Sequence, residues 1–171
     1  MNYQTCCTGH RPKGFPYQYG IDKQKHNFYM QTLSQNIELA ITEYAITNFI
    51  SGMAIGVDLD FAETVLKLRN KYLIKLECAI PCPNQTLKWN DTDKVRYESI
   101  LKRADKISII SERYTSECML KRNRYMVDKS GLVIAVFNGI EKGGTWYTIS
   151  YARETNTAIE LIDLCGLKNL N

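Results

Sequence analysis

Two glycine-containing stretches of the chain have the residue types and spacing that bind anions. In the first, SGMAIGVD (residues 51–58), two glycines lie four residues apart, and an aspartate follows the second glycine by two residues. A helical pattern follows this stretch, so we expect Gly56 to lie at the beginning of a helix. Glycine lets a backbone approach a ligand closely, and the first N–H groups of a helix have no partner within it. The stretch therefore predicts an anion-binding turn; the alternative is a plain strand-to-helix turn capped by Asp58.

The second stretch, GGTWYT (residues 143–148), repeats this arrangement later in the chain. Two glycines are followed by Thr145 and Thr148, which lie one helical turn apart. Thr145 can donate a hydrogen bond to a phosphate, or it can cap the helix that follows. Each stretch alone fits an ordinary turn, but both follow predicted strands, and two such loops at one sheet edge favour a binding site.

Charged residues accompany both stretches. Arg11 follows the first predicted strand, and Pro12 directs the chain away from the sheet there. Arg11 could bind a phosphate through two parallel hydrogen bonds. His10, with an ordinary pKa of about 6.5, could act as a general acid or base, or it could order the loop through hydrogen bonds. Asp58 would repel a phosphate, so we expect it to accept hydrogen bonds from ribose hydroxyls or an arginine, or to cap its helix.

The segment KRNRYMVDKS (residues 121–130) adds basic residues on a predicted helix. A charged run of this kind usually forms a solvated helix face. Asn123 and Arg124, however, come at the beginning of the helix, which is the end nearest the carboxyl edge of the sheet. Arg124 could therefore neutralise the charge of a ligand, and Asn123 could face either the cleft or the core.

Alternating strand and helix patterns position these residues. Strands are expected at residues 3–8, 46–50, 73–80, 106–111, 132–138 and 158–164, and helices at residues 25–45, 56–72, 91–104, 118–130 and 143–156. The expected buried face of the first helix consists of Phe28, Leu33, Ile37, Ala40, Ile41 and Tyr44. This order predicts an α/β fold, a single Rossmann-like three-layer sandwich with a mostly parallel sheet, as one domain over residues 1–171. Ligands of such sheets bind outside the carboxyl ends of the strands, where both glycine stretches lie.

Composition and missing motifs narrow the class of protein. A length of 171 residues suits one domain, and a net charge of +4 is compatible with a nucleotide or a nucleic-acid ligand without deciding between them. The sequence has no run of 18 apolar residues and no signal-peptide core at its N-terminus, so we expect a cytoplasmic protein without a membrane partner. The six cysteines are expected to be free thiols, and without a C-x2-C pair we expect no metal site. P-loop, G-x-S-x-G and H-E-x-x-H motifs are absent, and we expect no cofactor.

Five motifs in this order resemble the YpsA-like family of the SLOG superfamily. They are TGHRP, FISGMAIGVD, IPCPNQ with a later KW, KRNRYMVDKSG and GGTWYTISYA, and the similarity covers about residues 5–162. The resemblance implies a small stand-alone Rossmann-like domain whose biochemical role is largely uncharacterised.

Two relatives within this superfamily suggest functions for the glycine-rich edge. In the core of DNA-processing protein A (DprA), SGxAxGID, RNR and SGxxxTA motifs are similar to residues 51–58, 122–124 and 143–149 here, and that edge binds single-stranded DNA. In LOG-type phosphoribohydrolases, a PGGxGTxxE motif lies at the same junction as residues 143–149. This chain lacks the proline and the second glycine of that motif, and Ser150 or Tyr151 stands where the catalytic glutamate would fall.

Together these residues predict a binder or sensor of a nucleotide-derived small molecule. The alternatives are a single-stranded nucleic-acid-binding module similar to the DprA core and a hydrolase of nucleotide N-glycosidic bonds, so whether the chain is an enzyme stays open. Single-stranded DNA and a second copy of the chain, as a homodimer, are further candidate partners. The predicted ligand-binding residues are Thr8, Gly9, His10, Arg11, Ser51, Gly52, Met53, Gly56, Asp58, Asn123, Arg124, Gly143, Gly144 and Thr145.

Overall fold

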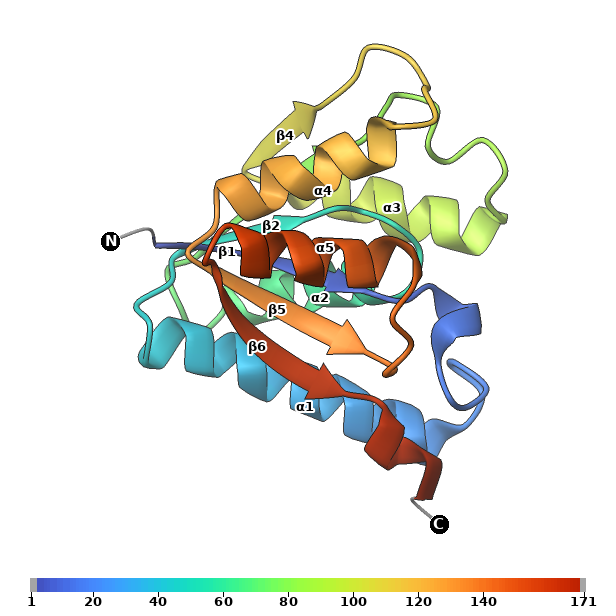
Figure 1. Cartoon of the computed structure of the whole chain (residues 1–171), viewed down its shortest axis with the longest axis vertical. Coiled ribbons are helices and arrows are strands. Elements are labelled where there is room, and N and C mark those ends of the chain that lie inside the picture. The colour runs from blue at the N-terminus through green and yellow to red at the C-terminus, as the bar shows by residue number, and fades with distance from the viewer. Residues whose placement is uncertain (1–2, 170–171) are drawn as a thin grey trace.

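The computed structural model describes residues 3–169 and contains one six-stranded sheet (Figure 1). The strands are β1 (Gln4–Gly9), β2 (Asn48–Ser51), β3 (Lys75–Ile80), β4 (Lys106–Ile109), β5 (Leu132–Phe137) and β6 (Ala158–Asp163). They lie in the order β4-β3-β2-β1-β5-β6, and every neighbouring pair is parallel. The predicted α/β Rossmann-like sandwich is therefore confirmed, and its sheet is entirely parallel in the described residues. The predicted domain also includes residues 1, 2, 170 and 171, which lie outside that range.

Helices cover both faces of the sheet (Figure 1). They are α1 (Lys23–Thr42), α2 (Val57–Leu68), α3 (Asp91–Arg103), α4 (Cys118–Asp128) and α5 (Gly143–Glu154), with short 3-10 helices at Pro12–Gly14 and Cys165–Asn169. The helices α1, α2 and α3 pack on one face around a core that includes Leu33, Phe61 and Ile100. The helices α4 and α5 pack on the other face around Met126 and Ile149.

The central strands are buried on both sides, as expected for a parallel sheet between helix layers. In β1, Cys6 belongs to the core beneath α4 and α5, and Cys7 belongs to the core beneath the other three helices. The strand order reverses at β1, because β2 lies on one side of it and β5 on the other. Open α/β sheets bind ligands in the crevice outside the carboxyl ends of the strands at such a reversal.

The buried face of α1 differs from the predicted one. It consists of Tyr29, Leu33, Ile37 and Ala40, whereas Phe28 and Tyr44 are about half exposed. Tyr29 lies in the i, i+4 row of Leu33 and Ile37, so it faces inward and Phe28 does not. Its buried hydroxyl donates a hydrogen bond to Asp60 at 3.1 Å. Tyr44 lies beyond the helix, beside Ala45, whose φ of 53° breaks the helical path.

Several predicted elements extend past the observed ones by up to four residues. The helix predicted at 56–72 ends at Leu68. The N–H groups of Lys71 and Tyr72 both donate hydrogen bonds to the Leu68 carbonyl, which forms a turn there. The last helix ends at Glu154, two residues before Asn156 with its φ of 53°. Hydrophobic spacing continues through such turns, so it does not mark the ends of elements well.

Buried Asp60 anchors the loop that follows β1. Tyr19 in this loop donates to the Asp60 carboxylate at 2.7 Å, and Arg96 of α3 lies 2.9 Å from Oδ1. Burial raises the pKa of Asp60, and the hydrogen bonds from Tyr19 and Arg96 oppose that shift. Phe15 packs its ring against Tyr29 at 5.0 Å between centroids. The loop is therefore tied to three helices, which fixes the residues between β1 and α1.

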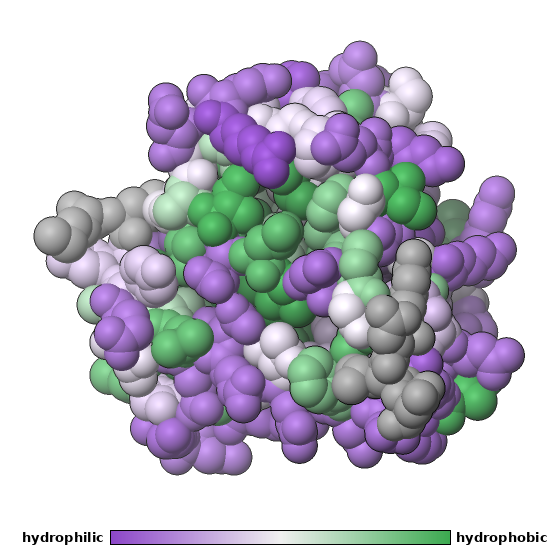
Figure 2. Space-filling view, turned by 60° about the horizontal axis from the view of Figure 1, so that its bottom comes forward, coloured by the Kyte–Doolittle hydropathy of each residue, from purple (hydrophilic) through white to green (hydrophobic). Residues whose placement is uncertain are grey.

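The surface of the protein has features that matter for binding a membrane or another protein. None of the helices in the described part of the chain is long and apolar enough to cross a membrane. Figure 2 shows an apolar area framed by hydrophilic side chains on one face of the molecule. Leu161 on the edge strand β6 is 50% exposed.

Replacing Ile37 by alanine should lower the free energy of unfolding by about 2–5 kcal/mol, because this side chain is fully buried in the core under α1. Leu39→Ala, two residues later on the same helix and 47% exposed, is the control. It should change the free energy of unfolding by less than ~0.5 kcal/mol. Urea denaturation followed by circular dichroism measures both, and equal losses would contradict the packing of α1.

Candidate functional site

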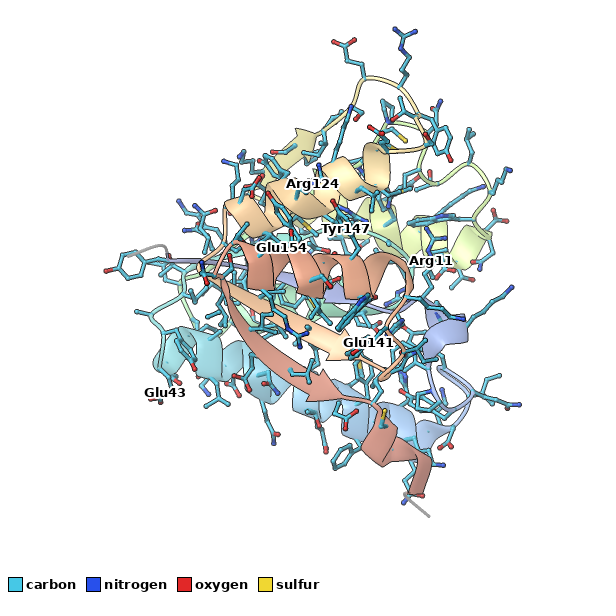
Figure 3. All side chains as sticks on the ribbon, in the orientation of Figure 1. Arg11, Glu43, Arg124, Glu141, Tyr147 and Glu154 are labelled. Atoms are coloured by element: carbon cyan, nitrogen blue, oxygen red, sulfur yellow. The ribbon has the colours of Figure 1, made fainter. Side chains whose placement is uncertain are left out.

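A cavity of about 290 Å³ lies at the carboxyl edge of the sheet, where the strand order reverses. Its wall consists of Cys7, Thr8, Gly9, His10, Arg11, Ala54, Asp58, Met119, Leu120, Arg122, Asn123, Met126, Gly144 and Thr145. Eight of the fourteen residues predicted from the sequence are among them. The end of β1 and the first turns of α2, α4 and α5 supply most of this wall. Figure 3 shows Arg11 beside the beginning of α5.

Three side chains in the wall are more than nine-tenths buried and carry polar atoms without a partner. They are Thr8, Asn123 and Thr145, at 6%, 7% and 6% exposure. Among the described residues, none makes a hydrogen bond with the Oγ1 of either threonine or with the Nδ2 of Asn123. None of these three atoms is among the fully enclosed polar atoms that lack a partner in the described residues, which belong to Arg69 and Gln85, so all three are accessible from the cavity. They are donors that the protein leaves open to whatever fills the cavity.

Arg122 fixes the orientation of Asn123. The Nε of Arg122 donates a hydrogen bond to the Oδ1 of Asn123 at 2.8 Å. Because a guanidinium only donates, the amide must turn its oxygen toward Arg122, which leaves its NH2 group for the cavity. The Nδ2 atom lies 3.9 Å from the place that a Cβ on Gly144 would occupy. The amide donor and the beginning of α5 therefore face the same space.

A buried ion pair joins α2 and α4 in the cavity wall. The Nη1 of Arg122 lies 3.4 Å from the Oδ2 of Asp58 and also donates to the Gly52 carbonyl. The Ala54 N–H donates to the same carboxylate oxygen at 3.2 Å. Burial raises the pKa of Asp58, and the charge of Arg122 opposes that shift. The other carboxylate oxygen, Oδ1, has no partner among the described residues, so it is open to a hydroxyl donor.

Gly52 and Gly56 make room for protein atoms, and neither lines the cavity. A Cβ on Gly52 would overlap the Arg122 guanidinium and lie 2.7 Å from the Oδ2 of Asp58. Gly56 has a φ of 97°, and a Cβ there would lie 2.6 Å from the His10 carbonyl oxygen. The spacing of the first glycine stretch therefore serves the ion pair and the packing of the loop after β1.

Ser51 and Met53 support the same region from outside the cavity. The Ser51 hydroxyl donates to the Asp58 carbonyl at 2.8 Å and accepts from the Met53 N–H at 3.1 Å. Met53 is fully buried with a φ of 58°, and its carbonyl accepts a hydrogen bond from Gln85. Both residues hold the turn that presents Asp58.

The second glycine stretch contributes directly to the cavity. Gly144 and Thr145 line it, whereas Gly143, with a φ of 80°, makes the turn just outside. The helix α5 begins after Lys142 without a side-chain cap and without an acidic residue in its first turn. Its first N–H groups therefore lack side-chain acceptors and favour an anion.

Arg122 lies in the cavity wall, and the predicted Arg124 does not. Arg124 is exposed, with its guanidinium 5.5 Å from the Tyr147 ring and 5.6 Å from the Tyr151 ring. Figure 3 shows Arg124 and Tyr147 close together between α4 and α5. The sequence signal for Arg122 is the i, i+3, i+4, i+7 spacing of four of the five cavity residues on α4, namely Met119, Arg122, Asn123 and Met126; Leu120 is the fifth.

His10 orders the loops around the cavity. Its Nε2 accepts a hydrogen bond from the Asn138 N–H at 3.2 Å, and its ring stacks on Phe137 at 5.9 Å between centroids. Burial lowers the pKa of His10. Accepting that bond requires a neutral ring, so the geometry supports the loop-ordering interpretation of this residue.

Comparisons with known proteins place the chain in a family. The YpsA model, described as the YspA SLOG family, matches residues 5–166. The chain belongs to this YpsA SLOG family. It is similar to the uncharacterized SPbeta prophage-derived protein YoqJ of Bacillus subtilis (strain 168), with 33% identity over 132 residues, which are 70% of this chain and 77% of that protein.

Two further relatives carry the name UPF0398. The UPF0398 protein YpsA of Bacillus subtilis (strain 168) is 26% identical over 144 residues, which are 81% of this chain and 80% of that protein. The UPF0398 protein of Bacillus pumilus (strain SAFR-032) is 29% identical over 143 residues, which are 80% of this chain and 76% of that protein. The predicted resemblance to the YpsA SLOG family is confirmed.

Replacing Arg122 by methionine should lower the free energy of unfolding by about 3–5 kcal/mol, because Asp58 would stay buried without its counter-charge. Adding Asp58→Asn should recover part of this loss, since an amide needs no counter-charge. Arg124→Met on the exposed face of the same helix is the control and should cost less than ~1 kcal/mol. Urea denaturation at pH 7 measures all three; equal losses for the two arginine variants would refute the buried pair.

Proposed function

We propose that this member of the YpsA SLOG family binds the ribose-phosphate part of a nucleotide-derived ligand in the cavity at the carboxyl edge of the sheet. The observation that carries the proposal is the set of donors on the largely buried side chains of Thr8, Asn123 and Thr145, which line the cavity and have no protein partner in the described residues. A phosphate supplies several acceptor oxygens at once. The first turn of α5 and the Arg11 guanidinium add positive charge at the same place.

The wall of the cavity contains both hydrogen-bond donors and an acceptor. Gly144, Thr145 and Asn123 present donors and would hold the phosphate. Asp58 presents its open Oδ1, which suits the hydroxyl groups of a ribose and repels a phosphate. A ribose phosphate would use the donors through its phosphate and the Asp58 acceptor through its hydroxyls, whereas a free phosphate would use only the donors.

A hydrolase of N-glycosidic bonds is the second candidate, favoured by Asp58. This carboxylate lies in the cavity wall, and its burial raises its pKa, as is common for groups that transfer protons. In that reaction water would add to the anomeric carbon of the ribose, and the base would leave with a proton. Single-stranded DNA binding, a cytoplasmic location and a homodimer stay predictions.

Gly144→Asp should weaken the binding of ribose 5-phosphate at least about tenfold, because it places a carboxylate where the phosphate would lie. The fold should tolerate the change, since a Cβ at this position meets only the Nδ2 of Asn123 at 3.9 Å, and an acidic residue suits a helix beginning. Isothermal titration calorimetry measures the affinity.

The matched control is Gly166→Asp, at a position where a Cβ meets no atom and which lies outside the cavity wall. It should bind ribose 5-phosphate like the unchanged protein. Equal binding by both variants, or no binding of ribose 5-phosphate or of any nucleoside monophosphate by the unchanged protein, would refute the proposal. Release of free base from a bound nucleotide, lost in Asp58→Asn, would identify the hydrolase.

A further inference from the structure

A second cavity of about 370 Å³ adjoins the first, and His10 lines both. The loop after β1 contributes Lys13, Phe15 and Pro16 to its wall, and the loop after β5 contributes Ile140 and Lys142. None of these five residues belongs to the set predicted from the sequence. The residues that line the two cavities are also close in sequence, because Lys142 of the second cavity comes two residues before Gly144 of the first.

Hydrogen bonds join the two walls of this second cavity. The Asn138 side chain donates to the Gly14 carbonyl at 2.9 Å, and the Asn138 N–H donates to His10 at 3.2 Å. The Ile140 N–H donates a hydrogen bond to the Asn138 side-chain oxygen at 3.0 Å, and this bond stabilises the turn that carries Ile140. A Cβ on Gly14 would lie 2.6 Å from the Cβ of His10, so the loop after β1 folds tightly over the imidazole. The pocket is therefore held by its own contacts before any ligand arrives.

The walls of the two cavities differ in chemistry. The first presents unpaired donors and a carboxylate. The second presents Phe15, Pro16 and Ile140, and Ile140 leaves 49% of its aliphatic surface exposed. Lys13 and Lys142 are exposed in the same wall and offer ammonium donors at its edge. Apolar walls with donors at the rim match a flat heteroaromatic ring, whose faces are apolar and whose edge carries nitrogen and oxygen acceptors.

We propose that the second cavity holds the base of the nucleotide whose ribose phosphate lies in the first cavity. This inference rests on the proposed function and goes further, because it assigns the ligand class as a nucleoside monophosphate or a larger molecule that contains one. The base packs against Ile140 and Pro16, and the ribose passes His10 on its way to Asp58.

The test compares ribose 5-phosphate with the four common ribonucleoside 5′-monophosphates by calorimetry. In the unchanged protein, the tightest of the four should bind at least about tenfold more tightly than ribose 5-phosphate. Ile140→Asp should bring this ratio close to one and leave the affinity for ribose 5-phosphate unchanged within about twofold, because a carboxylate there removes the apolar wall. Leu39→Asp, at 47% exposure on α1, is the control and should preserve the ratio.

The outcomes separate the base pocket from the proposed function. If ribose 5-phosphate binds as tightly as every nucleotide, the proposal that the second cavity holds the base is overturned, and the proposed ribose-phosphate site is unaffected. An Ile140→Asp variant that keeps the ratio, or that weakens sugar phosphate and nucleotide equally, would also overturn the base pocket. No binding of any of the five compounds by the unchanged protein would overturn the proposed function and the base pocket together.

Discussion

The buried ion pair between Asp58 and Arg122 is the constraint on which the site depends. It ties α2 to α4 at the carboxyl edge of the sheet, and the Gly52 carbonyl completes the coordination of the guanidinium. Desolvating two charges is costly, so the pair is stable only when each partner keeps its neighbours. Gly52 therefore carries no side chain, because a Cβ would overlap the guanidinium. The ion pair also determines what the cavity offers a ligand: Arg122 turns the amide oxygen of Asn123 inward and leaves its NH2 group unpaired.

The loops around the cavity are held in place by contacts that lie outside it. Asp60 holds the loop after β1 through Tyr19, and His10 joins this loop to the turn after β5. The donors of Thr8, Asn123 and Thr145 sit on three different elements, β1, α4 and α5, and do not pair with each other. Binding sites that keep their donors in place without a ligand lose less conformational entropy when the ligand arrives. The hydrogen bonds of Asn138 and Ile140 place the apolar wall around Ile140 next to the first cavity.

Much of the fold could be predicted from the sequence, because alternating strand and helix patterns specify a parallel sheet and its carboxyl edge. The two glycine stretches were correctly placed at that edge, yet their roles differ: Gly144 lines the cavity, and Gly56 accommodates the His10 carbonyl. Spacing alone cannot tell a glycine that makes room for a ligand from one that makes room for the protein. The choice of Arg124 over Arg122 has a similar cause, since a helix rotation of one residue decides which side chain faces inward. Asp60 gave no signal, because its partners Tyr19 and Arg96 are far apart in the sequence.

The most direct measurement is a nitrogen-15 NMR titration of the protein with ribose 5-phosphate. It observes the Asn123 side-chain amide together with the backbone amides of Gly144 and Thr145. Our account predicts that all three resonances shift along one saturable curve, because the phosphate accepts hydrogen bonds from this group of donors. Three resonances that stay in place at saturating ligand, or shifts confined to residues away from the cavity, would contradict it.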